Sequence, residues 1–221
     1  MKPNSVHTEG ISVWTVFFVR KLFKCVICMI LLFVLISASV LVMESGQLHS
    51  SLIRLHVVAD SDTAADQNAK LQVRDAVLDY LNTAMQAADV ETAKKFLSDH
   101  LDELKEIGER TLRLSGIQDP VFISLGKEPF PVRHYDTFSL PSGVYESLRI
   151  RIGSGEGENW WCVVFPSLCM GAVSGSFQDC AVSAGFTEPL VNTLAEENGY
   201  ELRFFFLDCL GKLQNFFYRY G

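Results

Sequence analysis

The sequence has few of the residue patterns on which catalysis usually depends. Its five histidines are scattered, and none forms the His-x-x-x-His or His-Glu pair that would suit zinc. The stretch from Gly171 to Gly175 misses the Gly-x-Ser-x-Gly pattern of hydrolases by one position. Repeats, low-complexity tracts and long linkers are also absent. These absences favour a protein that is not an enzyme and that needs no cofactor or metal.

Basic residues are outnumbered, with 19 Lys and Arg against 26 Asp and Glu. Residues 1–43 contain four bases and one acid, which leaves 15 bases and 25 acids, a net charge of −10, for residues 44–221. A domain this acidic would be repelled by phosphate backbones and by anionic lipid headgroups. Nucleic acid and peripheral membrane binding are therefore poor candidates, and a protein partner with a basic surface fits better.

One stretch lacks charge altogether, from Cys25 to Met43. At about 1.5 Å per residue, a helix of this length would nearly span the roughly 30 Å of bilayer hydrocarbon. Three bases precede the run and an acid follows it: Arg20, Lys21, Lys24 and Glu44. The positive-inside rule then keeps the N-terminus in the cytoplasm. We predict a cytoplasmic basic region (1–24), a signal peptide or membrane anchor (25–43) and an extracytoplasmic domain (44–221).

Cleavage of this segment stays open on the sequence. The run is longer than an ordinary signal core, yet Ser37, Ala38 and Ser39 resemble a cleavage site. A buried core helix is the alternative to a membrane segment. It is disfavoured because a helix that is apolar all round, with bases clustered at one end, seldom serves a small soluble domain.

The six cysteines divide between the apolar run and the predicted domain. Cys25 and Cys28 lie within the run and are expected to pack against lipid. Cys162 and Cys169 flank Pro166, where a strand could turn back, so they either form a disulfide in an oxidising compartment or remain two buried thiols. Nothing in the spacing decides whether Cys180 and Cys209 pair.

Periodicity predicts an α+β domain. Alternation from Ser51 to Ala59 predicts a strand, and the polar cluster at 60–63 supplies N-cap candidates for a helix. Helical spacing runs from Ala64 to about Ala87 and again from Glu91 to Leu114, so we expect a helical hairpin that turns through Ala88 and Asp89. Four β-type runs follow, at 121–125, 135–140, 145–152 and 160–165.

The hairpin is expected to pack on a mainly antiparallel sheet made by these strands. Residues 153–157, rich in glycine, are predicted to form a hairpin loop between the last two runs. The C-terminal part is predicted to contain a helix at 186–198, a final strand at 200–207 and a short aromatic helix or tail at 211–220.

Two groups of residues are the best candidates for chemistry or binding. His56, Asp60 and Asp62 could gather at a strand end as metal ligands or as an acid–base group, although a strand-to-helix turn with capping aspartates is the favoured explanation of the same residues. Trp160 and Trp161 must point to opposite sides of a strand, so one should enter the core. The other is either an interface anchor or covered by the C-terminal segment.

Three stretches together resemble one known family. They are Ile53–Val77, Phe130–Ile150 and Ile152–Cys169, the last containing Asn159-Trp160-Trp161-Cys162. In order and spacing over residues 52–170 they are similar to the stage II sporulation protein R family of endospore-forming bacteria, whereas the match is thin from Gly171 on. The family usually has Asn where Asp60 stands and a second proline where Ser167 stands.

The resemblance implies a signal and not a catalyst. Members are made in the forespore, exported into the space between its membrane and that of the mother cell, and needed there to activate a membrane-embedded aspartic protease. That protease processes the precursor of the early mother-cell sigma factor, pro-sigma-E. Partner-contact candidates from the matching motifs, each with a structural role as the alternative, are Arg54, His56, Asp60, Asp62, Arg133, Tyr135, Asn159, Trp160 and Trp161.

Two other classes of function remain open at this point. One is a membrane-associated hydrolase that uses His56, Asp60 and Asp62, with or without a metal. The other is a module that binds the cell wall.

Overall fold

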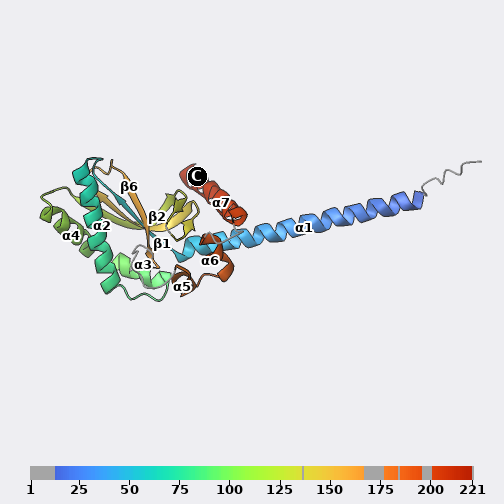
Figure 1. Cartoon of the computed structure of the whole chain (residues 1–221), viewed down its shortest axis with the longest axis horizontal. Coiled ribbons are helices and arrows are strands. Elements are labelled where there is room, and N and C mark those ends of the chain that lie inside the picture. The colour runs from blue at the N-terminus through green and yellow to red at the C-terminus, as the bar shows by residue number, and fades with distance from the viewer. Residues whose placement is uncertain (1–12, 136, 167–176, 184, 196–200, 221) are drawn as a thin grey trace, which may run out of the picture. The chain divides into compact units, whose positions relative to one another are not determined.

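The computed structural model describes residues 13–135, 137–166, 177–183, 185–195 and 201–220 (Figure 1). The chain divides into two compact units, Met1–Leu41 and Val42–Gly221. The second unit contains all the strands and the helices from α2 onward.

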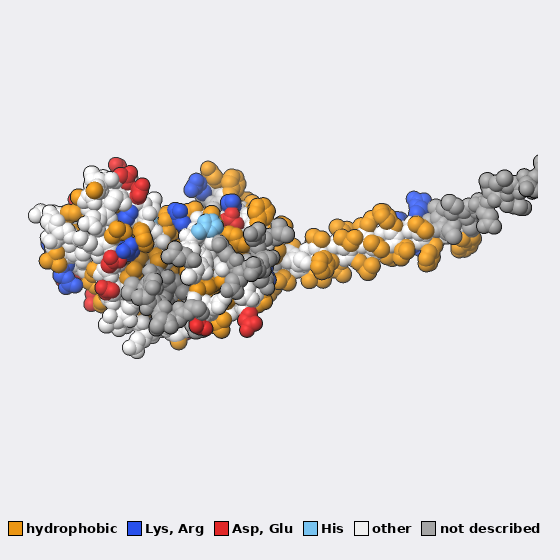
Figure 2. All heavy atoms as spheres, in the orientation of Figure 1, with side chains coloured by type: hydrophobic (Ala, Val, Ile, Leu, Met, Phe, Trp, Pro, Cys, Tyr) orange, Lys and Arg blue, Asp and Glu red, His pale blue; other side chains and the backbone are white. Residues whose placement is uncertain are grey.

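A single helix, α1 (Val13–Ser51), carries the predicted apolar run. Side chains 17–40 are all exposed, and Figure 2 shows them as a nearly continuous apolar surface with bases near its beginning. The stretch Phe17–Ser51 is long and apolar enough to cross a membrane, and none of its most apolar 18 residues is buried. The helix prediction is confirmed, and such an exposed apolar helix near the N-terminus is typical of a signal or an anchor.

Four strands form the main sheet: β1 (Ile53–Val58), β2 (Val121–Phe130), β5 (Gly143–Ile152) and β6 (Asn159–Phe165). Their order is β2-β5-β1-β6, in which β1 is parallel to β5 and the other two pairs are antiparallel. The prediction of a mainly antiparallel sheet is therefore confirmed. Because β1 is central, all six of its residues are buried.

The predicted helical hairpin covers one face of this sheet (Figure 1). It consists of α2 (Ala64–Ala84), α3 (Val90–Asp99) and α4 (Leu101–Leu114). Thr63 caps α2 by accepting a hydrogen bond from the backbone N–H of Asp66 at 3.2 Å. The helices and the sheet share one apolar core that includes Leu55, Val73 and Leu104, each 0% exposed.

The second helix of the hairpin is not continuous, so the prediction of one helix over 91–114 is wrong. His100 has φ −114° and ψ 16° and separates α3 from α4. Its ring stacks on Phe96 with the centroids 4.0 Å apart, and its Nδ1 lies 2.7 Å from the Phe96 carbonyl oxygen. A side chain that hydrogen-bonds to the backbone of the preceding turn competes with the regular helical pattern.

The predicted hairpin loop between β5 and β6 is also wrong, because β1 lies between these two strands. Residues 153–158 instead cross the end of β1. The backbone N–H of Gly157 donates to the Ala59 carbonyl at 3.0 Å, and that of Glu156 donates to the Asp60 carbonyl at 3.1 Å.

The remaining elements are a two-stranded hairpin and three helices. They are β3 (Arg133–His134), β4 (Ser139–Leu140), α5 (Phe177–Ser183), α6 (Glu188–Leu194) and α7 (Glu201–Tyr220). The predicted strand at 135–140 is reduced to β4, because the N–H of Tyr135 closes a turn onto the Phe138 carbonyl at 2.8 Å. The predicted helix at 186–198 is represented by α6, and residues 196–198 lie outside the described ones.

The predicted strand at 200–207 is wrong, since residues 201–207 are the beginning of α7, while residue 200 lies outside the described ones. Polar side chains of α7 hydrogen-bond to the segment 142–144: Asp208 accepts the N–H of Ser142 at 2.9 Å, and Gln214 accepts that of Val144 at 3.2 Å.

Candidate functional site

The sheet face opposite α2 and α4 carries a polar and aromatic group of side chains, which we call the His56 cluster. Alternation along β1 sends Leu55 and Val57 into the helix-covered core, and therefore directs Arg54 and His56 to the other face. The cluster comprises Arg54, His56, Glu128, Phe130, Tyr145 and Trp161.

Arg54 is 0% exposed and lies between two aromatic rings. Its guanidinium carbon is 4.3 Å from the Phe130 ring centroid and 5.0 Å from that of Tyr145. It donates to the Tyr135 hydroxyl at 2.8 Å and, from Nε, to the Cys162 carbonyl at 3.4 Å. Within the described part of the chain, the Arg54 guanidinium contacts aromatic rings and neutral oxygens, and no carboxylate forms an ion pair with it.

His56 is held from both ring nitrogens. Nδ1 lies 3.0 Å from a Glu128 carboxylate oxygen, Nε2 lies 2.6 Å from the Asn159 side-chain oxygen, and the ring stacks on Trp161 at 3.8 Å. Burial raises the pKa of Glu128, but the hydrogen bond and charge of His56 and the charge of Arg149 outweigh it and lower this pKa below its usual value. Glu128 is therefore ionised at neutral pH, and His56 has no free nitrogen for a ligand.

The predicted contact residues are distributed unevenly over this cluster and its rim. Arg54 and His56 are inside the domain, where a partner would meet them only through their neighbours. Arg133, Tyr135 and Trp161 are half-buried, with the Arg133 guanidinium 5.5 Å from the Trp161 ring centroid. Asn159 and Trp160 are exposed. Asn159 offers an amide that is already bound to His56, and Trp160 offers its indole ring.

The two tryptophans point to opposite faces, as predicted. Trp161 enters the His56 cluster, whereas Trp160 lies on the helix side of β6 with the Arg74 guanidinium of α2 4.2 Å from its ring centroid. Trp160 remains 38% exposed, so its outer surface is accessible beside a basic side chain.

Asp60 and Asp62 hold the 153–158 loop across the end of β1. Asp60 accepts the backbone N–H of Ser154 at 2.6 Å, and Asp62 accepts that of Glu158 at 2.7 Å. With His56 bound to Glu128, the three candidate ligands have separate partners. Within the described residues, no group of three or more His, Cys, Asp or Glu side chains could hold a metal. The hydrolase alternative therefore has no metal site in this part of the chain.

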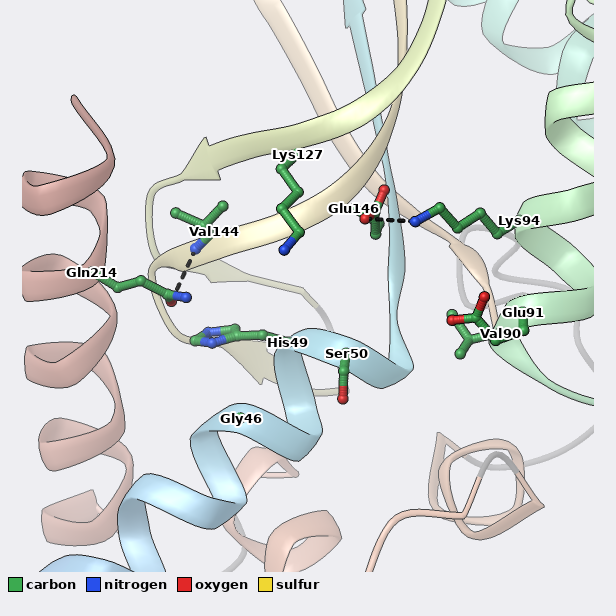
Figure 3. A pocket seen from close by; sticks show the side chains of 10 residues that line it. All are labelled: Gly46, His49, Ser50, Val90, Glu91, Lys94, Lys127, Val144, Glu146 and Gln214. Atoms are coloured by element: carbon green, nitrogen blue, oxygen red, sulfur yellow. Dashed lines mark hydrogen bonds and ion pairs between the residues drawn. The ribbon is translucent and has the colours of Figure 1, made fainter. Parts of the chain in front are cut away.

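A pocket of about 430 Å³ was not anticipated from the sequence (Figure 3). Its lining comes from α1, α3, β2, β5 and α7: Gly46, His49, Ser50, Val90, Glu91, Lys94, Lys127, Val144, Glu146 and Gln214. Lys94 pairs with Glu146 at 2.8 Å. Two bases face two acids, so the lining does not favour an anion or a cation. Because the lining residues come from five elements that are far apart in the sequence, no local pattern in the sequence could have indicated this pocket.

The cysteines are only partly described. Cys162 is in a disulfide, but Cys169 lies outside the described residues, so the pairing of these two stays a prediction. Cys209 is an exposed free thiol on α7, and this excludes a Cys180–Cys209 disulfide in the structure. Cys25 and Cys28 are exposed free thiols of α1.

Comparison with known proteins assigns the family. The family model for stage II sporulation protein R matches residues 49–174. The chain is 30% identical, over 180 residues, to stage II sporulation protein R of Bacillus subtilis (strain 168), a match that covers 73% of this chain and 80% of that protein. No solved structure matches. The family match takes in every strand of the sheet, the His56 cluster and the 153–158 loop, and the chain belongs to the stage II sporulation protein R family.

Proposed function

We propose that this chain is an exported signalling protein that activates a membrane-embedded aspartic protease during endospore formation. The protease would then process pro-sigma-E, and the domain would act in the space between the forespore and mother-cell membranes. The proposal is supported by family membership together with one observation. An exposed apolar helix preceded by three bases leads into an acidic domain whose best catalytic candidates are all engaged in hydrogen bonds within the fold.

Activation by binding requires that the domain bind the active form of the protease more tightly than the inactive form. A shift from about 1% to about 99% active needs roughly 10⁴-fold tighter binding. Such a difference usually depends on a few large side chains at the centre of an interface. Trp160 fits this role best, because it is exposed on the edge strand β6 and its ring is held in place by Arg74.

Co-expression in a non-sporulating host tests the proposal. The full chain, the protease and pro-sigma-E are produced together, and processing of the precursor is measured by immunoblot. We expect processing only when the chain is exported, and none with a variant that lacks residues 25–43 and stays in the cytoplasm. Processing of equal extent without this chain, or with the unexported variant, would contradict the proposal.

Substitution at Trp160 tests the proposed contact. We expect Trp160→Ala to reduce processing at least tenfold without loss of folded protein. Leu114→Ala is the matched control, because Leu114 is an apolar side chain on α4 that is 85% exposed. Equal processing by the Trp160→Ala and Leu114→Ala variants would show that the protease contacts another part of the domain.

A further inference from the structure

The outward face of α7 is apolar from Phe205 to Tyr220. Six large side chains on this face are between 51% and 72% exposed: Phe205, Phe206, Leu213, Phe216, Phe217 and Tyr220. Positions 205, 209, 213, 216 and 220 recur every three or four residues and so share one side of the helix. The exposed Cys209 thiol lies among them. A continuous aromatic face of this kind is uncommon on a surface that meets only water. We call it the α7 stripe, and Figure 2 shows apolar side chains where Figure 1 places this helix.

The inward face of α7 combines the fully buried Leu207 with a set of polar contacts. Asp208 accepts from the Ser142 hydroxyl at 2.6 Å, Asn215 donates to the Phe130 carbonyl at 2.8 Å, and the Tyr218 hydroxyl donates to the Lys127 carbonyl at 2.9 Å. A surface helix of a soluble domain normally has the opposite arrangement, with its apolar face inward. The composition of α7 therefore suits a helix whose outer side meets a second apolar phase.

The start of α7 lies where the chain leaves the predicted membrane segment. Arg203 forms a bidentate ion pair with Glu44, which is the residue directly after the run Cys25–Met43. The first charged residue after an apolar span marks the boundary between hydrocarbon and headgroups. The ion pair therefore brings the first turn of α7 to that boundary.

The charges along α7 favour a lipid surface. The helix contains three bases, Arg203, Lys212 and Arg219, and two acids, Glu201 and Asp208. Asp208 faces inward and pairs with Lys212 at 2.7 Å. Aromatic residues flanked by Lys and Arg are the composition of helices that lie in the membrane interface. The domain's net charge of −10 argued against such binding, but a net charge does not describe the local surface of one helix.

We propose that α7 lies on the outer lipid surface of the membrane that residues 25–43 enter, with the α7 stripe inserted among the headgroups and upper acyl chains. The contact would orient the domain on the membrane, and would retain it there if the segment were cleaved. It involves lipid alone and does not rest on the proposed activation of a protease.

A fluorescent label on Cys209 tests this proposal in the full chain. The protein carries Cys25→Ala, Cys28→Ala and Cys180→Ala, so that with the predicted Cys162–Cys169 disulfide Cys209 is the thiol left to label. It is labelled there with an environment-sensitive fluorophore and reconstituted into phosphatidylcholine vesicles with or without phosphatidylglycerol. Nitroxide-labelled phosphatidylcholine then quenches fluorophores that are close to the acyl chains. The matched control combines Cys209→Ala with Leu114→Cys, which moves the label to an exposed position on α4.

We expect at least threefold stronger quenching at Cys209 than at the α4 position, in either lipid. Phe216→Glu with Phe217→Glu should reduce quenching at Cys209 to the control level, while circular dichroism stays unchanged. Equal quenching at both positions in the unsubstituted stripe would overturn the proposal. Two further results would also overturn it. Quenching that disappears when the protein-to-lipid ratio is lowered would indicate contact with a second copy of the chain. Quenching at Cys209 that appears only when the protease membrane domain is added would indicate a protein partner.

Discussion

Arg54 shows how a residue that looks like a contact candidate can be part of the interior. Its side chain fills the space between Phe130 and Tyr145 and hydrogen-bonds to Tyr135. Removing it would leave a cavity and would take one hydrogen-bond donor each from the Tyr135 hydroxyl and the Cys162 carbonyl. We expect Arg54→Ala to lower the free energy of unfolding by about 3 kcal/mol, as measured by urea denaturation.

Arg110 provides the control for this experiment, because it is an exposed arginine on α4. The denaturation midpoint of Arg110→Ala should equal that of the unsubstituted protein. Equal midpoints for both alanine variants would show that the buried position of Arg54 is not important for stability.

Asp60 uses one oxygen, Oδ1, to accept the N–H of Ser154. An asparagine side chain has an equivalent oxygen, which can accept the same hydrogen bond. We expect Asp60→Asn to leave stability nearly unchanged and Asp60→Ala to lower it by about 1 to 2 kcal/mol. Amide hydrogen exchange at Ser154 is the direct measurement. It should become faster only in the alanine variant, and faster exchange in both would mean that the negative charge itself is required.

The position of α7 depends on one glycine. A Cβ added to Gly211 would lie 1.5 Å from the Ser142 carbonyl oxygen, so the helix could not keep its place. We expect Gly211→Ala to cost 2 kcal/mol or more, roughly the magnitude for overpacking a close contact, and to raise hydrogen exchange throughout α7.

Gly46 is the matched helical glycine, since a Cβ at that position meets nothing within 4 Å. Gly46→Ala should be neutral or stabilising by up to about 1 kcal/mol, because alanine favours helix more than glycine does. If Gly211→Ala behaved in the same way, the close approach of α7 to residues 142–143 would be disproved.

Topology determines how the whole molecule can act. With three bases before the apolar run, alkaline phosphatase fused after Gly221 should be active in a bacterial host, whereas a reporter that needs the cytoplasm should be inactive. Replacing Arg20, Lys21 and Lys24 with Glu should reduce the phosphatase activity. An active cytoplasmic reporter on the unsubstituted chain would remove the basis of the signalling proposal and of the α7 lipid contact.

Prediction from the sequence succeeded where local signals were strong. The first strand, the first helix with its N-cap and the opposite directions of Trp160 and Trp161 each follow from alternation or capping chemistry within a few residues. Prediction failed where the sequence pattern was ambiguous. The stretch 200–207 is apolar enough for a strand, but residues 201–207 belong to the long helix α7, whose Asp208 and Gln214 hydrogen-bond to the segment 142–144.

The sequence alone was sufficient for the long apolar helix near the N-terminus, the α+β class and the family, because charge distribution, periodicity and ordered motifs are properties of contiguous residues. Three further features required the fold. They are the crossing of the 153–158 loop over β1, the burial of Arg54 and His56, and the outward direction of the α7 stripe. Each depends on which distant segment occupies the neighbouring space, and periodicity within one segment carries no information about that neighbour.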